Sequence, residues 1–209
     1  GIADYVRRDT EHANPAHRPT KAQYDRYLWL VEHFRSLGWD SGKLHDASPF
    51  QVVDPGFNAI LIRSCFDLAA LAEELEMDDV AQRNYAWARR GLEALENLWS
   101  DPHRQYLCQD RTTGQLIEST SIGGLLAVFA PIRHTRAQAI AQRIEQISAE
   151  CRFSIPSHDP TDVRFDAKRC WRGPVWLIIN YLINDGLEAA DLEESSTKIV
   201  DDSLELIGS

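Results

Sequence analysis

Residues 54–76 read DPGFNAILIRSCFDLAALAEELE, and their pattern predicts a long helix. Asp54 followed by Pro55 is a strong helix-start signal, because an Asp side chain can cap the first turn and proline fits the first helical position. Apolar residues then occur on every side of the helix, which is typical of an inner helix rather than a surface one. Residues 78–99 follow with amphipathic spacing, and Asp78 is their expected N-cap. A link this short predicts an antiparallel helical hairpin.

The rest of the chain continues this alternation of apolar and amphipathic helices. Further helices are expected at 21–37, 121–129, 135–150, 175–187 (with Pro174 at its first position) and 190–206. A small β-hairpin is expected near 106–117, and long loops at 39–53 and 153–169. We therefore predict an all-α fold of antiparallel αα-hairpins, a single domain over residues 1–209, of the kind found in double-layered toroids or solenoids.

Composition excludes several classes of function. The net charge of −10 argues against a nucleic-acid partner, which requires a clustered basic surface. No apolar run approaches the ~20 residues needed to span a membrane, and the first residues carry no signal-peptide pattern. The four cysteines lack metal-ligand spacing and do not suggest a disulfide framework. These features indicate a cytoplasmic protein that binds neither membrane nor metal.

The densest cluster of candidate binding residues is CWRGPVW at 170–176. The indoles of Trp171 and Trp176 offer flat apolar faces that can stack on a sugar ring. Arg172 has a planar fork suited to carboxylates or neighbouring hydroxyls, and Gly173 lets a ligand approach the backbone. An ordinary helix start with aromatic core packing explains the same residues equally well.

Charged residues in the loops are weaker candidates. Asp40 and Asp166 are possible catalytic carboxylates, although solvated loop positions explain them as well. Arg8 and Arg18 lie in an arginine-rich opening loop, where a guanidinium could clamp a carboxylate or simply form surface ion pairs. The run Ser157-His158-Asp159 contains the residue types of a catalytic triad, but neighbours in sequence rarely have triad geometry.

The chain resembles glycoside hydrolase family 63, and it is particularly similar to the bacterial mannosylglycerate and glucosylglycerate hydrolases of that family. The resemblance covers nearly the whole chain, and the tryptophan motif is its most specific part. The segments that carry it are RPT at 18–20 with YDRY at 24–27, PF at 49–50, DPGFNAIL at 54–61, FSIPS at 153–157, CWRGPVW at 170–176 and NYLI at 180–183.

This resemblance implies a six-hairpin (α/α)6 toroid that hydrolyses α-glycosidic bonds with inversion and without a cofactor. Inversion uses two carboxyl groups about 6.5–9.5 Å apart, one as acid and one as base. The family's Glu-Ser-Gly-x-Asp acid motif and Glu-Tyr base motif have no counterpart here, and Cys170 replaces an aromatic residue. The resemblance makes Trp171 and Trp176 the walls of a sugar pocket, and makes Arg8 or Arg18 the clamp for a glycerate carboxylate.

Three hypotheses follow. The chain is a segment of an inverting α-glycosidase acting on a small substrate such as glucosylglycerate, and is inactive alone; or it is a non-catalytic carbohydrate-binding or scaffold domain; or it is a small complete enzyme that uses Asp40 and Asp166. An incomplete toroid would leave helices uncovered, so we also expect a homodimer formed through open toroid edges.

Overall fold

The computed structural model describes residues 2–209, which form two compact units. The first comprises the chain up to Gln51 together with Lys168–Cys170, and the second comprises Val52–Ala167 and Trp171–Ser209. Each unit is described by itself. The single domain expected over 1–209 stays a prediction.

The first unit is built on two helices. Helix α1 (Lys21–Ser36) begins at Thr20, whose side chain accepts a hydrogen bond from Gln23 N, while the Gln23 side chain accepts one from Thr20 N. This capping box satisfies amide groups that the first turn leaves unpaired. Gly38, with φ of 68°, follows the C-terminal end of α1, as the sequence predicts. A 3-10 turn, η1 (Pro15–His17), precedes the helix.

Helix α2 was not expected from the sequence. It spans Ser41–Ala47, inside a segment predicted to be a loop, and Asp40 caps it by accepting a hydrogen bond from Lys43 N at 2.9 Å. A helix of two turns that contains Gly42 has almost no hydrophobic periodicity, so the pattern could not reveal it.

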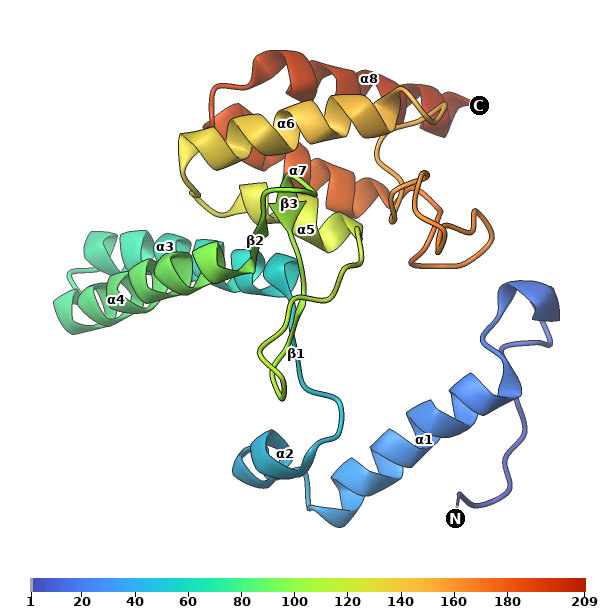
Figure 1. Ribbon diagram of the computed structural model, residues 1–209. Helices are drawn as coiled ribbons and strands as arrows, with labels where there is room; N and C mark the ends of the chain where they lie inside the picture. The colour runs from blue at the N-terminus through green and yellow to red at the C-terminus, as the bar shows by residue number, and fades with distance from the viewer. Residues whose placement is uncertain (1) are drawn as a thin grey trace. The chain divides into compact units, whose positions relative to one another are not determined.

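The second unit holds the hydrophobic core. Its helices are α3 (Pro55–Glu74), α4 (Asp78–Leu95), α5 (Ile122–Leu126), α6 (His134–Ser148), α7 (Leu177–Ala189) and α8 (Glu193–Gly208), with 3-10 turns η2 (Glu96–Leu98) and η3 (Ala127–Phe129). Figure 1 shows α6 and α8 grouped around α7, with α5 below them. Fully buried side chains from these helices, among them Ile140, Ile183 and Ile199, form one continuous core. The predicted all-α class is confirmed.

The α3–α4 hairpin confirms the predicted pair of antiparallel helices, although α4 ends at Leu95 and Trp99 lies in a short strand rather than in the helix. Asp54 accepts a hydrogen bond from Phe57 N at 2.7 Å, and Pro55 is the first helical residue. The expected cap of the second helix is wrong, because Met77 is the N-cap of α4 and the Asp78 side chain makes no capping bond. Figure 1 shows the two helices lying side by side along their length.

Two small antiparallel ribbons join the helices. Strand β1 (Val52–Val53) pairs with β4 (Gln109–Asp110), and β2 (Trp99–Ser100) pairs with β3 (Gln105–Tyr106). The chain reverses after β4, where Asp110 N bonds to Gln115 O and Gln109 bridges Leu116. This reversal is the β-hairpin predicted near 106–117, although the main partner of β4 is the distant β1.

The predicted start of α7 is wrong by three residues. Pro174 does not occupy the first helical position, because Ser157 N donates to Pro174 O and Val175 forms a β-bridge with Pro156. Trp176, in an extended conformation, is the N-cap of α7. Long-range pairing has therefore overridden a local helix-start signal.

One face of α3 is apolar and exposed within the second unit. Its large side chains are between 38 and 71% exposed and follow helical spacing; they are Phe57, Ile60, Leu61, Leu68, Leu71 and Leu75. Soluble monomers seldom leave a contiguous apolar surface of this kind uncovered. The expected homodimer has a candidate interface here.

Replacing Leu61 and Leu68 together with glutamate is expected to abolish self-association of the chain. Each leucine would lose roughly 1.5 kcal/mol of apolar burial at the interface, so the dimer dissociation constant should rise by roughly 100-fold. Sedimentation velocity at micromolar concentrations measures this change. Leu204→Glu, on an exposed face of α8, is the control. A wild-type chain that sediments as a monomer would contradict the proposed dimer.

Candidate functional site

The two tryptophans of the predicted site stack on one another. Their ring centroids are 4.9 Å apart and the ring planes are inclined by 20°. Trp171 remains 57% exposed and Trp176 is partly buried. This geometry corrects the picture of two walls with a sugar ring between them, because rings in contact leave no space for one. The apolar face that a ligand could contact is the outer surface of the stacked pair.

The loop that carries this pair is fixed by the preceding irregular segment. Gly173 N donates to Ser157 Oγ at 2.9 Å, and Ser157 N donates to Pro174 O at 3.0 Å. A Cβ atom at Gly173 would lie 2.3 Å from Asp166 O, so only glycine fits this approach. Asp166 N also donates to Arg172 O at 2.8 Å. The approach of a ligand expected at Gly173 stays a prediction, and the close neighbour in the structure is the backbone of Asp166 and Ala167.

A second layer of hydrogen bonds holds that segment in turn. Asn180 Nδ2, on α7, donates to Ser154 O at 2.7 Å, and Asp202 Oδ2, on α8, accepts from Ser154 N at 2.9 Å. The Ser154–Ile155 peptide bond is cis. Burial acts to raise the pKa of Asp202, but hydrogen bonds from Ser154 and Lys198, together with the positive charge of Lys198, outweigh it and lower the pKa. The sequence gives no hint of Asp202, which lies 48 residues from its partner.

The predicted arginines differ in their surroundings. Arg172 and Arg8 are exposed, and neither guanidinium makes a hydrogen bond or ion pair with another residue between 2 and 209. Arg18 is already paired with Asp9 at 3.2 Å, and Arg7 pairs with the same carboxylate at 2.6 Å. Arg7, and to a smaller degree Arg18, lower the pKa of Asp9 to about 2. A ligand carboxylate would have to compete with Asp9 for Arg18. It could bind the Arg8 guanidinium without displacing another described residue.

The two candidate catalytic carboxylates both have local structural contacts. Asp40 caps α2, and the backbone of Asp166 is tied to Arg172. The two residues belong to different units. Neither contact gives a carboxyl group the buried, apolar surroundings that would keep it protonated as a general acid.

The triad residue types do not form a triad. Asp159 is buried and ion-paired with Arg143, and it also accepts hydrogen bonds from Thr161 N and Oγ1. His158 Nε2 lies 3.2 Å from Asp162, and the hydroxyl of Ser157 accepts from Gly173. Each of the three residues therefore has a separate partner.

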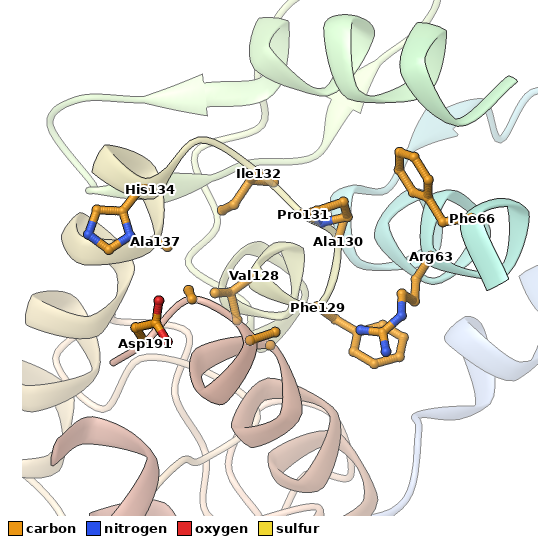
Figure 2. Close-up of a pocket in the computed structure, with 13 residues that line it drawn as sticks. Arg63, Phe66, Val128, Phe129, Ala130, Pro131, Ile132, His134, Ala137 and Asp191 are labelled. Carbon is orange, nitrogen blue, oxygen red and sulfur yellow. The ribbon is translucent and has the colours of Figure 1, made fainter. Parts of the chain in front are cut away.

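A cavity of about 430 Å³ lies elsewhere in the second unit (Figure 2). Apolar residues of η3 and the segment after it line one part of the cavity, and Arg63 stands over the Phe129 ring at 5.1 Å. Arg63 is already paired with Asp67 and Asp185. The cavity adjoins the C-terminal end of α7, whereas Trp176 precedes the N-terminal end, about 20 Å away along a helix of 13 residues. It is thus separate from the tryptophan pair.

Nothing in residues 2–209 gathers three or more His, Cys, Asp or Glu side chains in an arrangement that could hold a metal ion. None of the helices in this range is long and apolar enough to cross a membrane.

The sequence is similar to that of a known protein family. Residues 3–209 match the model of the mannosylglycerate hydrolase MGH1-like glycoside hydrolase domain. The chain belongs to this family. The mannosylglycerate hydrolase of Thermus thermophilus is 39% identical over 207 residues, which cover 99% of this chain and 49% of the relative. Mannosylglycerate hydrolase MGH1 of Selaginella moellendorffii is 37% identical, over 99% of this chain and 42% of the relative.

Solved structures agree with this MGH1-like assignment. The crystal structure of a family 63 mannosylglycerate hydrolase from Thermus thermophilus, in complex with Tris and D-glycerate, aligns with a TM-score of 0.94 at 38% identity. The match covers 99% of this chain and 50% of that one. The chain therefore spans about half the length of the relatives it matches, and its helices correspond to part of the family's helical domain.

Proposed function

We propose that this chain is a segment of an inverting α-glycosidase that cleaves a glycoside of glyceric acid, such as mannosylglycerate or glucosylglycerate. In this proposal the segment binds substrate through the outer face of the Trp171–Trp176 pair and through Arg172 beside it. Arg8 or Arg18 binds the glycerate carboxylate. The catalytic acid and base are not among the residues of this chain.

The observation that carries the proposal is the stacked tryptophan pair, with Trp171 exposed, on a loop fixed at Gly173 in a chain that belongs to this family. A flat apolar surface held rigidly in place suits the C–H face of a pyranose, since little conformational entropy is lost on binding. The same relative from Thermus thermophilus has been crystallised with Tris and D-glycerate and, separately, with glucose, and these complexes support a two-part ligand of this class. Arg8 supports the anionic part because its charge is not neutralised within the described chain.

Replacing Trp171 with alanine is expected to weaken mannosylglycerate binding by about 30-fold, equivalent to about 2 kcal/mol, because it removes the outer face of the stack. Isothermal titration calorimetry on the 209-residue chain measures the affinity. Trp87→Ala is the matched control, since Trp87 is a 47% exposed tryptophan on α4, and it should bind as the wild type does. A wild-type chain that binds no mannosylglycerate at millimolar concentration would overturn the proposal.

A further inference from the structure

We infer that Ser157 is a positioning residue for the tryptophan pair: its hydroxyl fixes the loop that presents Trp171 and Trp176 to a sugar. This inference rests on the proposed function for its biological meaning and on the local geometry for its mechanism. Ser157 is 1% exposed, and it contacts the motif through both its side chain and its backbone.

Ser157 connects the loop to the core of the unit. Its Oγ accepts from Gly173 N and its own N donates to Pro174 O, so the two segments pair in the manner of adjacent strands. Its carbonyl accepts from Ile122 N, at 3.1 Å, at the beginning of α5. Of the contacts made by Ser157, the bond from Gly173 is the nearest to Trp171 in the sequence, and its acceptor is the side-chain hydroxyl.

Asn180 anchors this segment to helix α7. Its side chain is fully buried, and its Nδ2 donates to Ser154 O at 2.7 Å. A hydrogen bond between buried groups restrains the backbone, because breaking it would leave the donor and the acceptor without a partner. The backbone is therefore fixed three residues before Ser157.

Glycine at position 173 makes the fixation necessary. No side chain at Gly173 can pack to hold the loop, and a Cβ there would collide with Asp166 O and Ala167 Cα. The hydrogen bond to Ser157 supplies the restraint that packing cannot. Without it, Gly173 N would be buried without its acceptor, and the loop would be expected to move out to find water.

Ser157→Ala and Ser157→Cys test the inference in the 209-residue chain. Both remove or weaken the acceptor, and the cysteine preserves the shape of the side chain. Amide hydrogen exchange at Gly173, followed by NMR, should become at least roughly fivefold faster in both variants. The circular-dichroism couplet produced by the stacked indoles should diminish, and mannosylglycerate affinity should fall. Ser196→Ala, which removes another buried hydrogen-bonded hydroxyl, should leave all three readouts unchanged.

These measurements distinguish a positioning role of Ser157 from a role in core packing, and they test that role separately from the proposed function. Wild-type Gly173 exchange and an intact indole couplet in Ser157→Cys would overturn the inference, even if Ser157→Ala fails to fold. Failure of the wild-type chain to bind mannosylglycerate would overturn the proposed function, while the exchange and couplet data would still decide the role of Ser157.

Discussion

The 209-residue chain alone is expected to release no sugar from mannosylglycerate, glucosylglycerate or aryl α-glucosides at an enzymatic rate. General acid and general base catalysis each contribute about 10²–10⁴-fold, and in the proposed function neither group belongs to this chain. The aspartates whose pKa departs clearly from its usual value are all shifted downward; they are Asp9, Asp25, Asp110, Asp162 and Asp202. A general acid requires a shift in the opposite direction.

Coupled detection of released mannose or glucose measures this result, and Asp40→Asn and Asp166→Asn provide the controls. Both variants should match the wild type, since Asn can still cap α2 and the Asp166 contact to Arg172 uses the backbone. Turnover on the order of 1–10³ s⁻¹ that either substitution abolishes would establish a small complete enzyme instead.

Gly124→Ala is expected to be the most destabilising single substitution proposed for the fold. A Cβ at this position in α5 would lie 2.0 Å from Tyr106 O and 2.6 Å from Gln105 Nε2. Tyr106 and Gln105 are both almost completely buried, so neither can move aside. Overpacking of this severity should cost at least about 3 kcal/mol, well above the gain of up to about 1 kcal/mol from replacing a helical glycine. The melting temperature should fall by roughly 6–12 °C.

Gly208→Ala is the matched control, because Gly208 is helical and has no neighbouring atom within 4 Å of a new Cβ. Its melting temperature should stay within about 1 °C of the wild type, given the small effect of surface substitutions. Equal melting temperatures for the two variants in differential scanning calorimetry would show that α5 can shift away from β3.

Local signals in the sequence predicted the helices that depend on local chemistry. Asp54-Pro55 places the beginning of α3 correctly, because its cap forms within one turn, and α1 begins at residue 21 as expected. Pro174 has the same local chemistry as Pro55, but no helix begins at Pro174. Its carbonyl accepts a hydrogen bond from Ser157 N, 17 residues earlier, and helix propensities do not account for such a distant partner.

The candidate site was predictable in composition but not in geometry. The residue types in CWRGPVW indicated an aromatic surface, and the structure places both indoles on one another. Stacking of residues five apart requires a particular non-helical loop, which Ser157 and Gly173 determine together. The anchors Ser154 and Asp202 could not be found from the sequence, because hydroxyl and carboxylate residues are common and their partners are distant.

The short link between α3 and α4 has a consequence for how the chain folds. Closing a loop costs entropy that grows with the logarithm of its length, so a hairpin with so short a turn assembles at little cost. The bonds that fix the tryptophan loop close much longer stretches, of 16, 26 and 48 residues, at Gly173, Asn180 and Asp202. The hairpin is therefore expected to form early in folding, and the tryptophan loop is expected to reach its final form only after the last helix, α8, has docked.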